Sequence, residues 1–246
     1  MFWEDSQIQN TEKKLFKNLS ISLVIPCYNE EEGIKKVIEN VPNSIDEIIV
    51  IDNNSTDKTA SIAKSLGAKV VFEPRQGYGY AYQRGFREAS KDIIVTGDGD
   101  YTYPVWDTPK ILDYMVTKEL DFISCNRFPI RNKEAMRIST YIGNILLTFA
   151  IRLCFFYPIK DSQSGMWVFK RELLSRIELT GGGMSLSEEI KIEVISNPAI
   201  KFKEYHIDYY PRVGASKIVK WKDGWKNFKF IFFKRISLWK RKARNH

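Results

Sequence analysis

The chain has 246 residues, of which 43% are hydrophobic and 28% charged, with a formal net charge of +8. This composition is typical of a globular protein with a sizeable core, and it excludes a disordered chain, a collagen-like fibre and a small disulfide scaffold. Eleven Lys and Arg side chains and one Asp lie in residues 216–246, so this segment carries +10 and the rest of the chain −2. The positive charge therefore belongs to the C-terminal segment, not to the body of the protein.

The cysteines and the first residues bear on the cell compartment. Cys27, Cys125 and Cys154 are odd in number and lack the spacing of a metal site, which indicates reduced thiols as in a cytosolic protein. Residues 1–20 carry acids and have no apolar stretch of roughly 7–15 residues. We therefore expect an N-terminal extension here, not a secretory signal.

Strands and helices are expected to alternate along the first 105 residues. Apolar, β-branched runs predict strands at 21–26, 47–52, 68–72 and 92–96. Helical patterns follow the first three strands, with Asn29 suited to cap the first helix and Ser55 or Thr56 the second. This alternation predicts an α/β fold in which a mainly parallel sheet lies between two layers of helices.

The second half of the chain is less regular. We expect helices over 109–118, 138–157 and 187–196, strands over 121–125, 166–169 and 202–210, and a glycine hinge at 181–183. The uncharged part of the 138–157 helix is too short to span a bilayer, and a longer span would bury Arg152 in hydrocarbon at about 2.5–3.5 kcal/mol. We therefore predict a buried or interfacial helix there.

Acidic residues follow two of the predicted strands. Asp98 and Asp100 flank a glycine after the strand at 92–96, and Asp52 ends the strand at 47–52. Ligands of parallel sheets bind at the carboxyl ends of strands. Two such carboxylates can converge on Mg²⁺ or Mn²⁺ and leave positions for phosphates, although Asp-Gly-Asp is also ordinary turn chemistry. Asp52 is a buried charge that needs a partner, such as a nucleobase or ribose edge.

Eight short motifs, taken in order, resemble one class of enzyme. VIPCYNE at 24–30, VIDNNSTD at 50–57, QGYG at 76–79 and DGD at 98–100 resemble the nucleotide-sugar half of inverting glycosyltransferases of the GT-A fold. NRF at 126–128, the stretch from Arg137 to Asn144, DSQSG at 161–165 and RVGASK at 212–217 resemble the dolichyl-phosphate (polyprenyl-phosphate) hexose synthases in particular. The resemblance covers roughly residues 20–220.

The resemblance implies roles for particular residues. Those implied to bind the nucleotide sugar are Pro26, Tyr28, Glu30, Asp52, Gly77, Asp98, Asp100, Arg127, Arg212, Ser216 and Lys217, with Asp98 and Asp100 also holding Mg²⁺ or Mn²⁺. A metal and guanidinium groups stabilise the charge on a departing pyrophosphate without proton transfer. Arg212 and Lys217 also suit ordinary surface positions. The commoner Asp-Asp pair after the second strand is Asp52-Asn53 here, with one charge fewer.

Glu188 and Glu189 open the predicted helix after the glycine hinge, where related enzymes place a catalytic carboxylate. A sugar hydroxyl acceptor needs such a base, whereas a phosphate monoester, with a second pKa of about 6, is already largely ionised. Acids also suit a helix N-terminus on electrostatic grounds alone. We expect one of the two glutamates in the site, with Asp100 and Arg127 as further catalytic residues, and leave open which one.

Aromatic residues recur through the basic segment. Those at spacings of three and four are Trp221, Trp225, Phe228, Phe232, Ile236 and Trp239, with Lys222, Lys226, Lys229 and Lys240 beside them. The spacing predicts one narrow stripe on a helix, a pattern typical of helices that lie at a membrane surface, where each basic residue contributes about 1 kcal/mol. A helix packed on the body and a nucleic-acid-binding patch are the alternatives.

These observations predict three parts: an extension over 1–20, a GT-A catalytic domain over 21–215 and a membrane-associating amphipathic tail over 216–246. Within the domain, residues 21–105 form the nucleotide-sugar half and 106–215 the acceptor half. The predicted activity is transfer of a hexose with inversion, from a UDP-sugar in preference to GDP-mannose, to polyprenyl (dolichyl) phosphate at the cytoplasmic membrane face, with no nucleic-acid partner. Residues expected on the acceptor side are Arg131, Arg137 and Ser164.

Two other functions stay open at this point. One is a GT-A glycosyltransferase that acts on a glycan or other hydroxyl, with Glu188 or Glu189 as its base. The other is a module that binds a nucleotide sugar or a membrane without catalysis.

Overall fold

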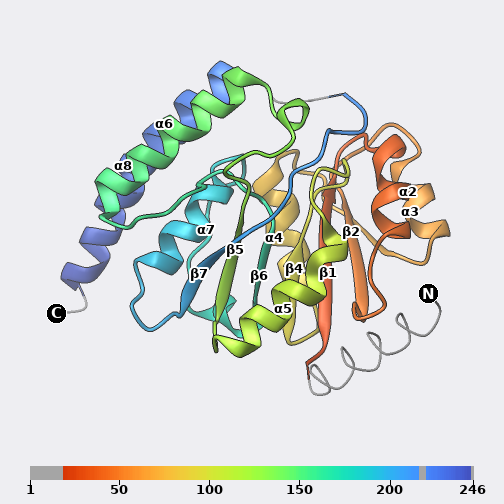
Figure 1. Ribbon diagram of the computed structural model, residues 1–246, viewed down its shortest axis with the longest axis horizontal. Coiled ribbons are helices and arrows are strands. Elements are labelled where there is room, and N and C mark those ends of the chain that lie inside the picture. Colours follow the sequence, from red (N-terminus) through yellow and green to blue (C-terminus); the bar gives the residue numbers. More distant parts are fainter. Residues whose placement is uncertain (1–18, 216–219, 245–246) are drawn as a thin grey trace.

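The computed structural model describes residues 19–215 and 220–244, and shows a twisted sheet with helices on both faces (Figure 1). Its helices and strands, in chain order, are β1 (Ile21–Cys27), α2 (Glu31–Glu39), β2 (Glu47–Asp52), α3 (Thr59–Ser65), β3 (Lys69–Phe72), α4 (Tyr78–Glu88), β4 (Ile93–Thr96), α5 (Thr108–Thr117), β5 (Phe122–Asn126), α6 (Ile138–Phe155), β6 (Trp167–Lys170), α7 (Leu186–Ile195), β7 (Phe202–His206) and α8 (Lys220–Arg244). The predicted α/β alternation is confirmed.

The sheet has seven strands in the order β3-β2-β1-β4-β6-β5-β7. Strands β3, β2, β1 and β4 are mutually parallel, and β7 is parallel to β5. Only β6 is antiparallel, pairing with β4 on one side and β5 on the other. Because β6 runs against its neighbours, the loop that precedes it lies at the edge where the other strands end.

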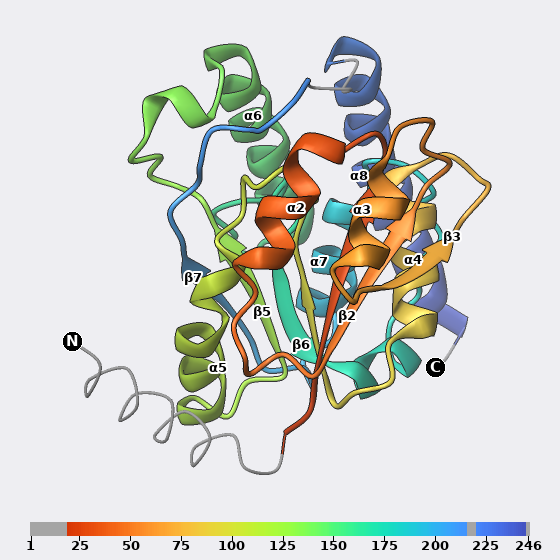
Figure 2. The same cartoon turned by 90° about the vertical axis from the view of Figure 1, so that its right-hand side faces the viewer.

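Helices cover both faces of the sheet, as Figure 2 shows. Leu23 and Ile25 of β1 pack in the cluster that includes α2, α3 and α5, whereas Val24 between them packs in the cluster that includes α4 and α7. This alternation is what a strand buried on both faces requires. Gly85 brings α4 close to the sheet, since a Cβ there would lie 2.3 Å from Cγ1 of Val24. The predicted three-layer arrangement is confirmed.

The loops after β1 and β2 bind each other, and this changes two predicted helix starts. Asn29 does not cap α2; its Oδ1 accepts a hydrogen bond from the amide of Thr56 at 2.8 Å. Helix α3 begins at Thr59, because Asp57 Oδ1 accepts from the Thr59 amide at 2.9 Å. The predicted caps at Asn29 and at Ser55 or Thr56 are therefore wrong, since both segments serve the contact between the loops.

Helices α6 and α8 lie side by side next to the sheet (Figure 1). Ile151 of α6 and Ile231 of α8 are fully buried in a small apolar cluster that also contains Ile192 of α7. By length and composition α6 is able to cross a membrane, and it is the one such helix among the described residues. Much of its apolar surface is nevertheless exposed, including Leu146 and Phe149 at 61% each.

Candidate active site

The loops after β1 and β4 meet a segment from the far end of the chain. Arg212 lies with Nη1 2.5 Å from Asp100 Oδ2, and its Nη2 contacts Glu30 Oε1. The amide of Val213 donates to the carbonyl of Asp100 at 2.9 Å and fixes this segment against the loop. The structure thus brings together Glu30, Asp100 and Arg212, three of the residues predicted to bind the nucleotide sugar.

Asp98 lies beside this cluster at the end of β4. Its Oδ1 is 3.2 Å from the hydroxyl of Tyr82 and 3.4 Å from that of Tyr78. Burial, followed by the charge of Asp100, raises the pKa of Asp98 to about 7. A nearby cation would favour the ionised form of this carboxyl.

The carboxylates fit a metal that binds together with phosphate. Among residues 19–215 and 220–244 no group of three or more His, Cys, Asp or Glu side chains is placed to hold an ion. Mg²⁺, however, is usually held by one or two carboxylates and completes its shell with water and substrate phosphates. Asp98 and Asp100 supply that donor set, and the raised pKa of Asp98 means that a cation would relieve an unfavourable charge.

The Asp52-Asn53 pair at the end of β2 has a structural explanation. Asp52 Oδ1 accepts from the amide of Ser55 at 2.9 Å. Asn53 Nδ2 donates to the carbonyls of Glu73 and Arg75 at 3.0 and 2.8 Å, and its Oδ1 accepts from the Gly77 amide at 2.8 Å. An ionised Asp only accepts hydrogen bonds, so it would not hold both carbonyls. The amide therefore ties the loop after β3 to the end of β2.

The predicted glycine hinge packs against the start of α4. Gly77 has a φ of 153°, and a Cβ there would lie 2.2 Å from the carbonyl oxygen of Gly182. The amide of Tyr80 donates to the same oxygen at 3.1 Å, and Gln83 Nε2 donates to the carbonyl of Gly181 at 2.8 Å. Residues 180–183 thus form one wall beside the glycine-rich loop.

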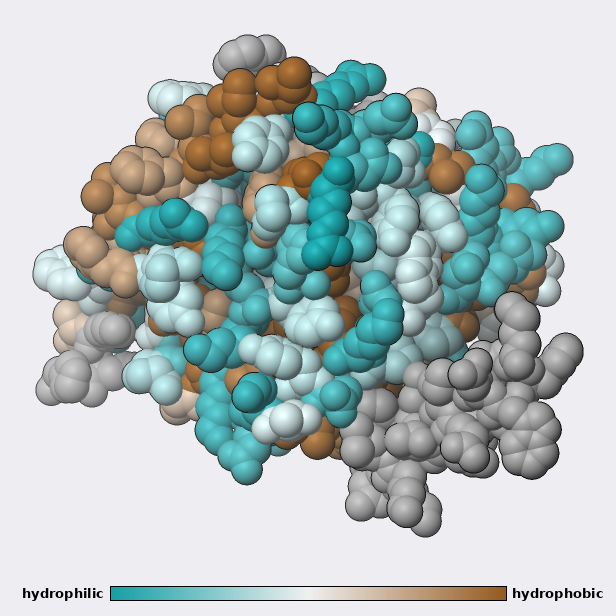
Figure 3. All heavy atoms as spheres, in the orientation of Figure 1, coloured by the Kyte–Doolittle hydropathy of each residue, from teal (hydrophilic) through white to brown (hydrophobic). Residues whose placement is uncertain are grey.

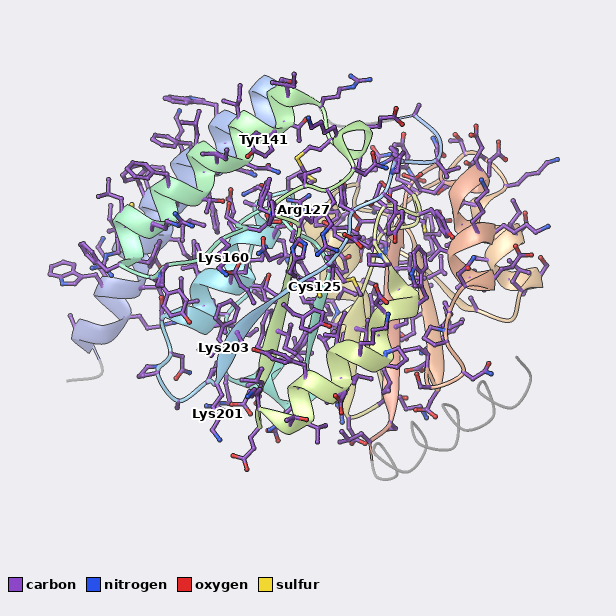
Figure 4. All side chains as sticks on the ribbon, in the orientation of Figure 1. Cys125, Arg127, Tyr141, Lys160, Lys201 and Lys203 are labelled. Carbon is purple, nitrogen blue, oxygen red and sulfur yellow. The ribbon has the colours of Figure 1, made fainter. Side chains whose placement is uncertain are left out.

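Arg127 follows β5 and is buried, below α6 in Figure 4. Its Nε and Nη2 lie 2.8 and 2.9 Å from the two carboxylate oxygens of Asp161. Although burial opposes ionisation, Arg127 holds the pKa of Asp161 below its usual value. Arg127 thus anchors the 161–165 loop to the end of β5, and its contact with phosphate stays a prediction.

Lys191 of α7 belongs to the site although sequence reasoning missed it. Its fully buried ammonium donates to the carbonyls of Asp161, Ser162 and Ser164 at 3.0, 2.9 and 2.7 Å. Burial lowers the pKa of Lys191 to about 8. The available signal was a lysine in a helix whose residues from Leu186 to Val194 are otherwise apolar, small or acidic.

The structure distinguishes the two glutamates, both of which are fully buried. Glu189 Oε2 accepts from the amides of Thr180 and Gly181 at 3.0 and 2.7 Å, so it holds the hinge. Glu188 Oε1 accepts from Gln163 Nε2 at 2.6 Å, while its Oε2 has no hydrogen-bond partner in the described part of the chain. Burial raises the pKa of Glu188 to about 8. Glu188 is therefore the better candidate for chemistry.

The remaining predicted residues are spread out. Arg131 is exposed, lies 3.2 Å from Asp208 and lines an open cavity of about 590 Å³, and Arg137 is exposed at the start of α6. Ser164 is fully buried. Pro26 is buried within β1, and Tyr28, which follows the end of that strand, is 37% exposed. Ser216 and Lys217 lie outside the described residues.

The sheet order and the helices on both faces define an α/β domain with acidic side chains at the carboxyl edge of its sheet. Residues 22–178 match the model of glycosyl transferase family 2. The chain belongs to this family, whose GT-A fold was expected from its motifs.

Two relatives with named activities come from an archaeon. A dolichyl-phosphate hexose transferase of Haloferax volcanii is 30% identical over 204 residues, which cover 80% of this chain and 86% of that protein. The low-salt glycan biosynthesis hexosyltransferase Agl6 of the same organism is 31% identical over 219 residues, covering 86% of this chain but 53% of Agl6. The chain thus spans about half the length of Agl6.

Solved structures share the fold. Glucosyl-3-phosphoglycerate synthase of Mycobacterium tuberculosis in complex with Mg²⁺ and UDP superposes with a TM-score of 0.73 at 22% identity, covering 92% of this chain and 82% of that one. The same enzyme with Mn²⁺ and UDP-glucose gives a TM-score of 0.72 at 22% identity, with the same coverage of both chains.

Proposed function

We propose that this chain transfers a hexose from a nucleotide sugar, preferably a UDP-sugar, to polyprenyl (dolichyl) phosphate with inversion. The observation that carries the proposal is the placement of Arg212 against Glu30 and Asp100, beside Asp98, at the carboxyl edge of the sheet. The relative named as a dolichyl-phosphate hexose transferase supports the acceptor. The UDP complexes of the structural neighbours support the choice of nucleotide.

The geometry suits departure of a nucleoside diphosphate. A divalent cation held by Asp98 and Asp100 would neutralise the charge that develops on the diphosphate. Arg212 already lies beside these carboxylates, so its guanidinium is placed to stabilise the same leaving group. The lipid phosphate is largely ionised at neutral pH, so it attacks the anomeric carbon from the opposite side without a base. Glu188 would then position the sugar or the acceptor.

We place the protein at the surface of a membrane, on its cytoplasmic face, through α6 and α8. Hydrophobic side chains gather over α6 in Figure 3. Phe149 of α6 is 61% exposed, and Trp225, Phe233 and Trp239 of α8 are 59%, 68% and 67% exposed. Aromatic rings beside lysines favour the boundary between lipid headgroups and acyl chains. In this arrangement residues 21–105 serve the donor and residues 106–215 the acceptor, except that Arg212 reaches back to the donor side.

Transfer into lipid is the direct test. The full chain is incubated with radiolabelled UDP-hexose, Mn²⁺ and vesicles containing polyprenyl phosphate, and we expect label in the organic extract. Asp100→Ala should lower this transfer by about 100-fold or more, whereas Lys203→Met, at an exposed position on β7 (Figure 4), should leave it unchanged. Full activity of Asp100→Ala in the presence of Mn²⁺ would contradict the metal role.

A second candidate function has its own observation. Glu188 is a buried carboxyl with an unpartnered oxygen and a pKa raised to about 8, which suits a general base for a hydroxyl acceptor. In that case label enters a water-soluble glycan, and Glu188→Gln abolishes the transfer. A binding module without catalysis would bind UDP and transfer label to neither acceptor.

A further inference from the structure

Helix α8 carries a buried lysine on the face opposite its exposed aromatic rings. Lys234 is 8% exposed, and its Nζ donates to Glu189 Oε1 at 2.8 Å and to the carbonyl of Glu178 at 3.1 Å. The same ammonium lies 2.8 Å from Glu193 Oε1. Two buried carboxylates of α7 thus share one cation supplied by α8.

Glu189 extends this contact to the glycine hinge. While Oε1 faces Lys234, Oε2 accepts from the amides of Thr180 and Gly181. A Cβ on Gly181 would lie 3.0 Å from that same oxygen, so the hinge backbone is in close contact with the carboxylate. The position of the hinge backbone therefore depends on where the carboxylate of Glu189 is held.

The hinge in turn contacts the start of α4. The carbonyl of Gly182 accepts from the amide of Tyr80 and faces Gly77, and a Cβ on Gly79 would lie 2.0 Å from the carbonyl oxygen of Gly181. Gly77 is one of the residues that we propose for the nucleotide sugar. A continuous series of contacts thus runs from α8 through Glu189 and the hinge to the glycine-rich loop at 76–79.

Two more side chains on the same face of α8 support this connection. Arg241 Nη2 lies 2.9 Å from Glu193 Oε2, and Nη1 lies 3.3 Å from Glu178 Oε2. Asn227 Nδ2 donates to Gln163 Oε1 at 3.3 Å, and Gln163 donates to Glu188. The inner face of α8 therefore reaches both the hinge and the 161–165 loop.

We propose that Lys234 is a positioning residue that sets the Gly181–Gly183 hinge against α4 and so shapes the nucleotide-sugar site. The helix that faces the lipid would then also complete the donor side of the enzyme. Without the ammonium, Glu193 keeps Arg241, but the buried carboxylate of Glu189 loses the cation at its Oε1 and is expected to move. The nature of the ligand rests on the function proposed above.

The test compares Lys234→Met with Lys234→Arg, using Lys203→Met as an exposed control that makes the same chemical change. Hydrogen exchange of the Thr180 and Gly181 amides should be at least tenfold faster in Lys234→Met only. The KM for UDP-glucose with Mn²⁺ should rise about tenfold while kcat stays within about threefold. Lys234→Arg should restore both quantities, and binding to anionic vesicles should be the same in all variants.

Exchange in the wild-type chain provides a test that needs no variant. Because coupling between two sites is reciprocal, UDP with Mn²⁺ should slow exchange in the Gly181–Gly183 hinge and in α8 around Lys234. Unchanged exchange in α8, or an unchanged KM in a folded Lys234→Met, would overturn the proposal. If Lys234→Met alters hinge exchange but the wild type transfers no sugar, the positioning role stands and the proposed function fails. If the wild type transfers sugar and the hinge ignores Lys234, only the positioning role fails.

Discussion

Arg127 and Asp161 form a buried ion pair, with 6% and 0% of their side chains exposed. Removing one partner of such a pair leaves an uncompensated charge and costs about 3–5 kcal/mol. We therefore expect Arg127→Met to lower the free energy of unfolding by about this amount, measured by urea denaturation at pH 7.

The double variant Arg127→Met/Asp161→Asn is the control. It removes both charges and keeps an oxygen for the amides of the 161–165 loop, so at least half of the lost stability should return. A cost below about 1 kcal/mol for the single variant would mean that Arg127 is not a structural residue. In that case its predicted contact with phosphate would be the better explanation of the residue.

The raised pKa of Glu188 predicts how stability depends on pH. Burial raises it from 4.5 to about 8, so the folded chain holds a proton that the unfolded chain has released. The contribution of Glu188 to the free energy of unfolding is therefore fully present below about pH 4.5 and is lost as the pH rises towards 8. Glu188→Gln should flatten this decline in denaturation curves measured between pH 5 and 8.5. An equal decline in both proteins would show that Glu188 ionises normally in the folded state.

The sequence indicated which residues gather at the carboxyl edge of the sheet better than it indicated the residues that hold the loops of this edge in place. Glu30, Asp100 and Arg212 carry motifs, and the structure brings them together. Lys191 carries no motif, because its role depends on three carbonyls that lie 27 to 30 positions earlier in the chain. In the sequence, Asn53 stood out only because it replaces a charged Asp. Its role depends on a contact with the loop after β3, which ends at Gly77.

At the scale of elements, α8 shows how one stripe can hide another. The aromatic stripe was visible in the sequence, and its described members from Trp225 to Trp239 do lie on the exposed side. The buried face is formed by Asn227, Ile231, Lys234 and Leu238. Its spacing is as regular, but two of its members are polar. Their burial depends on partners from elsewhere in the fold, Gln163 of the 161–165 loop for Asn227 and Glu189 of α7 for Lys234. The helix packs on the body, as one of the alternatives had it, and it also exposes its rings, so its contact with a membrane stays a prediction.

Because α8 has an exposed aromatic face and a separate buried face, we predict that the exposed face can be changed without unfolding the helix. Replacing Trp225, Phe233 and Trp239 together by Ser should remove about 1 kcal/mol of lipid contact for each residue, or roughly a 100-fold loss of affinity for anionic vesicles. Vesicle flotation measures the loss, and the Tm without lipid should change little because these side chains are exposed. Unchanged flotation would refute the assignment of this face to the membrane.

Strand β6 is the element whose direction the sequence left undefined. A short apolar run predicts a strand but does not indicate which strands it pairs with or in which direction. Here β6 lies between β4 and β5 and is antiparallel to both. That orientation brings the 161–165 loop to the carboxyl edge, where Asp161 meets Arg127 and Gly165 meets Tyr78. Mainly parallel pairing was correctly predicted, but the position of this loop depended on the one exception.

At the scale of the whole molecule, the segments at the carboxyl edge of the sheet lead along the chain to the exposed helices α6 and α8. The segment after β5 leads to α6, and the segment that carries Arg212 leads towards α8, which begins at Lys220 (Figure 1). A lipid whose phosphate must reach the donor edge would therefore meet α6 and α8 on the way. This arrangement suits an acceptor that stays in the bilayer while its headgroup reacts.

Ligand binding to this domain should raise the stability of the entire chain. At 100 times its Kd, a ligand that binds only the folded state adds about 2.7 kcal/mol. For a chain of 246 residues this corresponds to a rise in Tm of roughly 5–10 °C. We expect UDP with Mn²⁺ to produce this shift in thermal denaturation, GDP with Mn²⁺ to produce a smaller one, and UDP without metal to produce little.

Asp98→Asn should abolish the part of the Tm shift that depends on Mn²⁺, because Asp98 is one of two carboxylates available to the ion. An equal shift with GDP would contradict the preference for UDP, and a larger one would reverse it. A shift that does not depend on Mn²⁺ would contradict the metal role.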